Sequence, residues 1–200
     1  KAYENYIKSL ELYKQLKNED SIAKCNLVLF NLITSQDNLE DNSKHYLDEY
    51  YSYALAKKDT LMLLNASNKY AKFFWNRDTI EVSRNYYKNS LQLINNNKEL
   101  EKNKVSIYSN LAYLYSKVSK DSSNFYFLKT LKLEKHLSKN QLLGTYINYA
   151  VHLKNQKKYT EAIKQLKKAE KIELKAYQLK YNKILFRNLA NYYKLSENYK

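Results

Sequence analysis

Apolar residues recur along this chain at spacings of three and four, the period of an α-helix with one buried face. The pattern breaks only at short polar segments rich in Asp, Asn, Ser and Lys. It predicts ten helices of about 16 residues, each about 24 Å long. Their predicted ranges are 1–17, 21–36, 42–58, 60–76, 79–95, 99–118, 122–138, 140–156, 159–175 and 178–196.

Four of the predicted helices share a short motif, in which an alanine is followed three residues later by a large apolar or aromatic residue. The alanines are Ala71, Ala112, Ala150 and Ala190, at intervals of 41, 38 and 40 residues, and the large residues are Phe74, Tyr115, Leu153 and Tyr193. A small residue lets a neighbouring helix approach closely, and a large residue one turn later fills the space beside it. The spacing therefore predicts an internal repeat of helix pairs.

This repeat resembles the tetratricopeptide repeat (TPR) family, whose unit is a helix–turn–helix of about 34 residues. The best copy is YINYAVHLKNQKKYTEAIKQLKKAEKI, which carries Tyr146, Tyr149 and Ala150 on its first helix and Ala162 and Ala169 on its second. The resemblance implies an all-α fold in which antiparallel helix pairs stack into a right-handed superhelical solenoid.

The resemblance extends over the whole chain, as a single array covering residues 1–200. The array consists of a half repeat at 1–18, repeats at about 20–58, 60–97, 99–138 and 140–175, and a half repeat at 177–200. Because it starts and stops on half repeats, we expect it to be a fragment of a longer protein. End faces without capping elements expose apolar surface, so self-association through these ends is one open alternative.

Long-period repeats rich in Tyr, Asn and Lys resemble those of Bacteroidetes-type bacterial regulators, in which a TPR array precedes a DNA-binding domain or a histidine kinase module. The resemblance implies a protein- or peptide-binding scaffold, the sensing or docking module of a larger signalling or transcriptional regulator. No stretch approaches the roughly 18 apolar residues of a transmembrane helix, and no signal peptide is visible. We expect no membrane insertion by this segment and a cytoplasmic location, or a periplasmic one if an upstream signal has been removed.

In TPR proteins the first helix of each pair lines a concave groove, and its second, fifth, sixth, ninth, twelfth and thirteenth positions face the ligand. Carried onto this chain, the resemblance implies a set of ligand-binding candidates in that groove. They are Asn68, Lys69, Lys72, Trp75, Asn110, Tyr113, Asn148, Lys154, Arg187, Asn188 and Asn191. Trp75 is the only Trp, and it can serve either as an exposed anchor or in helix packing.

Asn110, Asn148 and Asn188 hold the same position in three consecutive repeats. An Asn side chain donates to a peptide C=O and accepts from its N–H at the same time. Such a ladder of asparagines could hold an extended chain by its backbone, as in similar peptide-binding TPR proteins. The charge that binds a terminal carboxylate could come from Lys72, Lys154, Arg187 and Lys194. The alternative is that an Asn-rich chain aligns asparagines through composition and repeat duplication.

Composition and motifs argue against catalysis. The chain has no Pro and one Gly, Gly144, which excludes Walker A and GxGxxG phosphate sites. No HExxH, CxxC or GxSxG motif is present, and His45, His136 and His152 fall in different repeats. The single Cys25 cannot form an intrachain disulfide. We therefore expect no enzyme activity, no cofactor and no metal.

The positive charge is concentrated in the second half of the chain. Of the 35 Lys and Arg and 20 Asp and Glu, residues 101–200 hold 21 and 7, a net charge of +14. Lys164, Lys168, Lys171 and Lys175 form one stripe on the predicted helix 159–175. A solvated face and an acidic partner surface are both compatible with this stripe. Nucleic-acid binding by the basic half is the alternative function, although three Arg are few for reading phosphates or bases.

Overall fold

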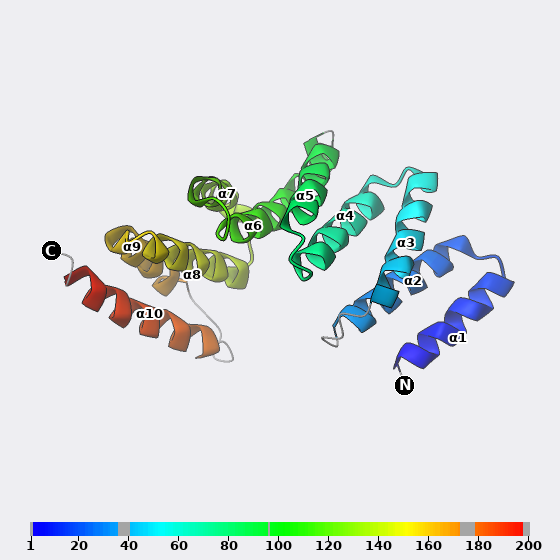
Figure 1. Cartoon of the computed structure of the whole chain (residues 1–200), viewed down its shortest axis with the longest axis horizontal. Coiled ribbons are helices and arrows are strands. Elements are labelled where there is room, and N and C mark those ends of the chain that lie inside the picture. Colours follow the sequence, from blue (N-terminus) through cyan, green and yellow to red (C-terminus); the bar gives the residue numbers. More distant parts are fainter. Residues whose placement is uncertain (1, 36–40, 96, 173–178, 198–200) are drawn as a thin grey trace. The chain divides into compact units, whose positions relative to one another are not determined.

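We analysed a computed structural model of the chain, which describes residues 2–35, 41–95, 97–172 and 179–197. Within these ranges every regular element is helical (Figure 1). The α-helices are α1 (Ala2–Gln15), α2 (Glu19–Thr34), α3 (Lys44–Lys57), α4 (Thr60–Trp75), α5 (Ile80–Asn95), α6 (Lys104–Tyr115), α7 (Lys120–Lys132), α8 (Lys139–Asn155), α9 (Tyr159–Glu170) and α10 (Leu179–Glu197). Three short 3-10 helices are η1 (Asp41–Ser43), η2 (Lys98–Asn103) and η3 (Glu134–His136). The predicted all-α fold with ten α-helices is confirmed for the described residues.

Two predicted helices are shorter than expected because short 3-10 helices replace their expected α-helical turns. The helix predicted at 99–118 starts as η2 and becomes α-helical only at Lys104. The helix predicted at 122–138 ends at Lys132, where the N–H of Leu133 bonds to the C=O of Thr130 at 3.0 Å instead of continuing the α pattern. Such tighter turns are common at helix ends. The helix predicted at 159–175 also ends early, at Glu170, where Lys171 and Ile172 are no longer helical, and residues 173–175 lie outside the described residues.

The chain divides into two compact units, unit 1 (Lys1–Lys98) and unit 2 (Glu99–Lys200). In unit 1 each of α1 to α4 packs against the next helix along the chain. Its buried core includes Leu29, Leu47 and Tyr70. Phe30 packs on Phe73 of α4, with the ring centroids 6.1 Å apart. Burial also raises the pKa of the Cys25 thiol in this core.

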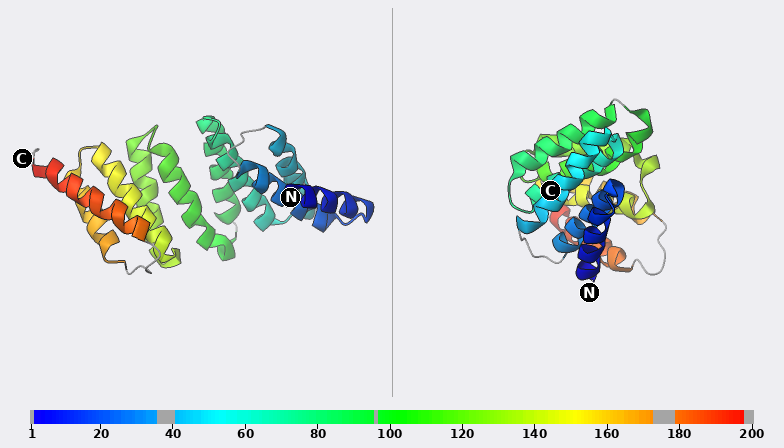
Figure 2. Two further views of the ribbon diagram at one scale, coloured as in Figure 1. Left: turned by 90° about the horizontal axis from the view of Figure 1, so that it is seen from below. Right: turned by 90° about the vertical axis from the view of Figure 1, so that its right-hand side faces the viewer.

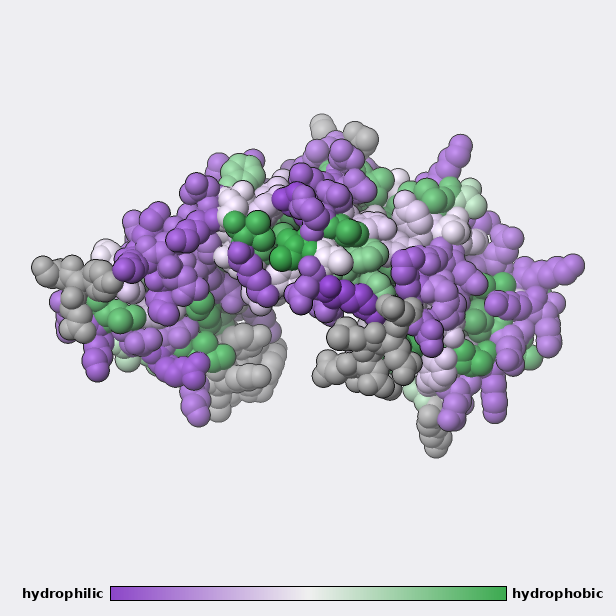
Figure 3. Space-filling view, viewed as in Figure 1, coloured by the Kyte–Doolittle hydropathy of each residue, from purple (hydrophilic) through white to green (hydrophobic). Residues whose placement is uncertain are grey.

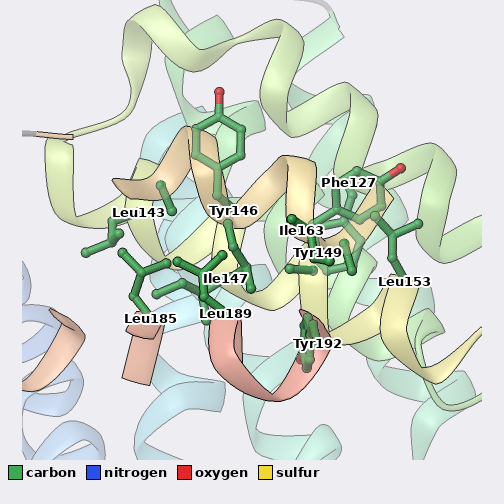
Figure 4. Close-up of a cluster of buried hydrophobic side chains, with 14 of the residues drawn as sticks. Phe127, Leu143, Tyr146, Ile147, Tyr149, Leu153, Ile163, Leu185, Leu189 and Tyr192 are labelled. Atoms are coloured by element: carbon green, nitrogen blue, oxygen red, sulfur yellow. The ribbon is translucent and has the colours of Figure 1, made fainter. Parts of the chain in front are cut away.

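In unit 2, α6 packs on α7, and α9 packs on both α8 and α10 (Figure 2). Leu143 and Ile147 of α8 face Leu185 and Leu189 of α10 in the buried core (Figure 4). Tyr149 of α8 stacks on Phe127 of α7, with the ring centroids 4.9 Å apart. Consecutive helices are thus joined by one continuous apolar cluster.

Three of the four repeat alanines lie in the buried contact between two helices. Ala71, Ala112 and Ala150 are fully buried. The hydroxyl of Ser83 on α5 donates to the C=O of Ala71 at 2.6 Å, and the hydroxyl of Ser123 on α7 donates to that of Ala112 at 2.7 Å. Ala190 on α10 is exposed, since no described helix follows α10 to cover it. As the repeat pattern predicted, the alanine is buried in each repeat where a second helix packs on it.

Across the described residues, no helix combines the length and apolar character that crossing a lipid bilayer requires.

Candidate binding surfaces

Three equivalent asparagines lie on the first helices of the repeat in unit 2, namely α6, α8 and α10. Each precedes the repeat alanine by two residues, a rotation of about 200° around the helix axis. The asparagine therefore lies away from the side on which a second helix covers the alanine. Asn110 and Asn148 are exposed, and Asn188 is half-buried. We call the side chains of Asn110, Asn148 and Asn188 together the asparagine surface.

Two amides of this surface are not engaged by the described chain. Neither Asn110 nor Asn148 makes a side-chain hydrogen bond to another residue that the structure describes. Each such amide offers two N–H donors and one carbonyl acceptor. This combination suits a peptide backbone, which also carries both kinds of group.

The other predicted groove residues of unit 2 flank these asparagines. Tyr113 on α6 is 53% exposed. Arg187 and Asn191 on α10 are exposed, and Lys154 on α8 is half-buried. The structure therefore leaves all seven candidates of unit 2 at least partly accessible, with two cations among them.

The four candidates of unit 1 have a different environment on α4. Lys69 takes the position of the asparagine, and its Nζ donates to Oδ1 of Asn31 at 2.6 Å. Burial lowers the pKa of Lys69, and the charge of Lys72 adds to this effect. Asn68 keeps a buried Oδ1 that has no hydrogen-bond partner among the described residues. Lys72 is exposed and Trp75 is half-buried. The asparagine pattern is thus a feature of unit 2.

The predicted lysine stripe follows α9. Lys164, Lys168 and Lys171 are all exposed, whereas Lys175 lies outside the described residues. Hydrophilic residues cover most of the face of α8 and α9 that Figure 3 turns to the viewer. A pocket of about 800 Å³ beside α9 is lined by all three lysines and by Tyr193 of α10.

A second hollow lies between α7 and α9. Two adjoining pockets of about 380 and 470 Å³ share Leu128 of α7, Tyr149 of α8, and Gln165 and Lys168 of α9. Because these four residues line both pockets, the two form one continuous depression, which we call the α7–α9 groove.

The rim of the α7–α9 groove is strongly basic. Its lysines are Lys129, Lys132, Lys158, Lys164 and Lys168. Its carboxylates are Glu134 and Glu161, and the hydroxyl of Tyr146 donates to Glu134 at 3.1 Å. Burial raises the pKa of Tyr146, and the carboxylate of Glu134 adds to the shift. Within the described ranges, none of the five lysines forms an ion pair with a carboxylate.

Exposed apolar side chains lie beside these lysines. Phe125 and Leu128, one turn apart on α7, are each 51% exposed and both line the groove. The Nζ of Lys129 lies 5.2 Å from the centroid of the Phe125 ring, and the Nζ of Lys168 lies 5.7 Å from that of Tyr146. The groove therefore joins an apolar strip to a cationic rim.

The histidines do not assemble a reactive site in the described chain. His152 is buried, with Nε2 3.3 Å from the C=O of Lys120 and Nδ1 3.4 Å from the hydroxyl of Ser123. Burial lowers the pKa of His152. His45 and His136 are exposed. Among the described residues, no three His, Cys, Asp or Glu side chains group closely enough to hold a metal ion.

The apolar part of the α7–α9 groove was not predicted from the sequence. The lysine stripe of α9 was predicted, but Phe125 and Leu128 were not. The signal was present, because these two residues lie outside the buried face of α7 that Ser123, Phe127 and Thr130 define. A large apolar residue off the core face of a surface helix deserves to be considered as a contact for a partner.

Comparisons with known proteins give the fold alone. A scan with protein-family models and a search of curated proteins both returned no match. Among solved structures, the chain is similar to the crystal structure of BtubC (BKLC) from P. vanneervenii, with a TM-score of 0.83. That similarity covers 98% of this chain and 83% of BtubC at 18% sequence identity. It supports an all-α fold of repeated, packed helix pairs.

Proposed function

We propose that this chain is a protein- or peptide-binding scaffold of the TPR type, which holds an extended peptide on the asparagine surface of unit 2. The observation that carries the proposal is the equivalent placement of Asn110, Asn148 and Asn188, with the first two exposed and without hydrogen bonds among the described residues. The helix-pair packing and the resemblance of the repeat support the TPR assignment.

Such a surface suits an extended chain. An extended chain rises about 3.3 Å per residue and carries an N–H and a C=O at nearly every peptide bond. A peptide that crosses α6, α8 and α10 would therefore present backbone groups to each asparagine in turn. Each amide would donate to a peptide C=O and accept from an N–H, so recognition would depend little on the peptide sequence. Arg187 and Lys154 would favour a peptide with a carboxylate nearby.

Within a larger bacterial signalling or transcriptional regulator, this scaffold would act as the sensing or docking module. Binding would favour one arrangement of the helix pairs over another, and so shift the population that an effector domain experiences. This part of the proposal rests on the resemblance of the repeat.

The test compares two triple variants as bait in extracts of the source cells. Asn110→Ala/Asn148→Ala/Asn188→Ala removes the asparagine surface, and Asn85→Ala/Asn89→Ala/Asn95→Ala removes three exposed asparagines of α5 as a matched control. Circular dichroism verifies folding of both. Retained peptides are identified by mass spectrometry, resynthesised, and titrated in original and scrambled sequence.

We expect wild type and the α5 control to retain the peptide, the asparagine-surface variant to lose it, and the scrambled peptide to bind with similar affinity. Equal retention by all three baits would show that the aligned asparagines do not bind the partner.

Nucleic-acid binding is the second candidate function, and the exposed stripe of Lys164, Lys168 and Lys171 is the observation in its favour. It predicts that a labelled single-stranded oligonucleotide binds, and that its affinity falls steeply between about 50 and 200 mM salt. Peptide retention that is insensitive to nuclease would favour the scaffold instead.

A further inference from the structure

We propose that the α7–α9 groove is a separate docking site for an acidic protein segment that carries apolar side chains. The groove is lined by α7, by α9 and by Tyr146, Tyr149 and Leu153 of α8. The asparagine surface and the lysine beside it use other residues of α8, Asn148 and Lys154, together with α6 and α10. The two sites have α8 in common but no lining residue, and the inference does not depend on the proposed function.

Charge complementarity identifies the acidic character of the partner. Five lysines line the groove against two carboxylates, and one of those carboxylates, Glu134, already accepts the hydroxyl of Tyr146. Within the described residues the five lysines have no carboxylate partner. Cations clustered around a concave surface attract and orient an anionic partner. An Asp- or Glu-rich segment supplies the missing carboxylates.

The apolar strip indicates a polypeptide. Phe125 and Leu128 are each half exposed and lie beside the lysines. Apolar side chains of a bound segment would remove both from water, at about 25 cal/mol for each Å² of apolar surface buried. A phosphate backbone offers no apolar groups for these contacts. An acidic peptide with Leu or Phe side chains would pair with the lysines of the rim and cover Phe125 and Leu128 at the same time.

Gln165 adds a third, independent feature. Its Oε1 is buried and has no hydrogen-bond partner among the described residues, and its side chain lines both pockets of the groove. A buried acceptor without a donor is unfavourable. A rotation of the side chain would bring Oε1 to the groove surface, where a peptide N–H can donate to it. Phosphate oxygens only accept, so they cannot satisfy this atom.

The test uses the full chain and labelled synthetic peptides, followed by fluorescence anisotropy. The probe is a short peptide of alternating Glu and Leu. One matched peptide replaces Leu by Ser and another replaces Glu by Lys, and a single-stranded oligonucleotide represents nucleic acid. The groove variants are Lys164→Gln/Lys168→Gln and Leu128→Gln, all at exposed positions. The control is Lys102→Gln/Lys183→Gln, which removes the same charge from exposed lysines that do not line the groove.

We expect wild type to bind the Glu/Leu peptide and the double groove variant to weaken it about tenfold. Leu128→Gln is expected to weaken it about threefold, and the control by less than about twofold. The Glu/Ser and Lys/Leu peptides should bind at least about tenfold more weakly than the Glu/Leu peptide.

Three results would overturn the proposal. One is equal loss in the control and the groove variant, which would mean that only net charge matters. Another is equal binding of the Glu/Ser peptide, which would show that the apolar strip is not used. The last is tight binding of the oligonucleotide with no binding of the Glu/Leu peptide, which would assign the basic surface to nucleic acid.

Discussion

Two residues before the repeat alanine, unit 1 has Lys69 and unit 2 has Asn110 and Asn148. Lys69 is half-buried and donates to Asn31 of its own unit, whereas the two asparagines are exposed and make no hydrogen bond within the described chain. The same repeat position therefore makes an internal hydrogen bond in unit 1 and stays exposed in unit 2.

The packing positions do not differ in this way. Ser83 in unit 1 and Ser123 in unit 2 make the same buried hydrogen bond to the repeat alanine, at 2.6 and 2.7 Å. Both units also contain a buried tyrosine whose hydroxyl donates to a carboxylate, Tyr70 to Asp48 at 2.5 Å in unit 1 and Tyr146 to Glu134 at 3.1 Å in unit 2. The comparison teaches that the repeat maintains its close contacts while its surface positions diverge.

The largest loss of stability should come from a substitution in the core of unit 2. Leu143 is fully buried on α8, so Leu143→Ala should lower the free energy of unfolding by about 2–5 kcal/mol. Urea titration followed by circular dichroism measures it. Leu128→Ala, at a half-exposed site on α7, is the control and should cost far less. Similar losses for both variants would contradict the assignment of Leu143 to the core.

A smaller loss of stability is expected at the two buried serines, and it should be the same for both. Ser83→Ala and Ser123→Ala each remove a hydrogen bond to an alanine carbonyl and should each cost about 1 kcal/mol. Ala162 of α9, which is also fully buried, shows that alanine fits this kind of position. The same urea titrations apply. A large loss in only one unit would break the claim that both units share this packing.

The asparagine and lysine positions should separate the units most clearly. Lys69→Ala removes the bond to Asn31 and should cost about 1 kcal/mol. Asn148→Ala should change stability by less than about 0.5 kcal/mol, because its side chain is exposed. Paired unfolding curves measure the difference. If Asn148→Ala destabilised the chain more than Lys69→Ala, the asparagine would have to be structural.

The smallest expected effect is a pH dependence of stability, which arises from His152 in unit 2. Burial lowers the pKa of His152, with the charges of Lys120 and Lys158 adding to it. The unfolded chain therefore binds a proton before the folded chain does, and stability should fall as the pH drops below about 6.5. We expect Tm to fall between about pH 7.5 and pH 5.5, and His152→Gln to reduce that fall.

His136→Gln, at an exposed position, is the control for this pH dependence. An undiminished fall of Tm in His152→Gln would assign the dependence to other groups. Those groups would lie elsewhere in the chain, because Ser123, Gln156 and Phe127 around the His152 ring do not titrate in this range.

Much of the fold was predictable because helix periodicity and the alanine spacing are local properties of the sequence. Both gave the ten helices and the small residues at their contacts. The early end of α7 was not predictable, since it depends on how Leu133 and Thr130 bond at one turn. The bond of Lys69 to Asn31 was also missed, because it joins residues 38 positions apart in the chain.

The candidate site was predictable only in part. The repeat indicated which residues lie on the first helices, and the structure leaves Asn110, Asn148 and Arg187 exposed there. The α7–α9 groove was not predicted, because it needs Leu128, Tyr149 and Gln165 from three helices to lie together. Periodicity within one helix contains no such information.

The most direct test of the asparagine surface is an NMR titration of the chain labelled with ¹⁵N-asparagine. The side-chain amide signals of Asn110, Asn148 and Asn188 are assigned from the single Ala variants, and the peptide retained by the wild-type bait is added. We predict that these three signals shift together, while that of Asn124 in the α7–α9 groove stays in place. Shifts at Asn124 with none at Asn110, Asn148 or Asn188 would contradict the account and move the peptide to the groove.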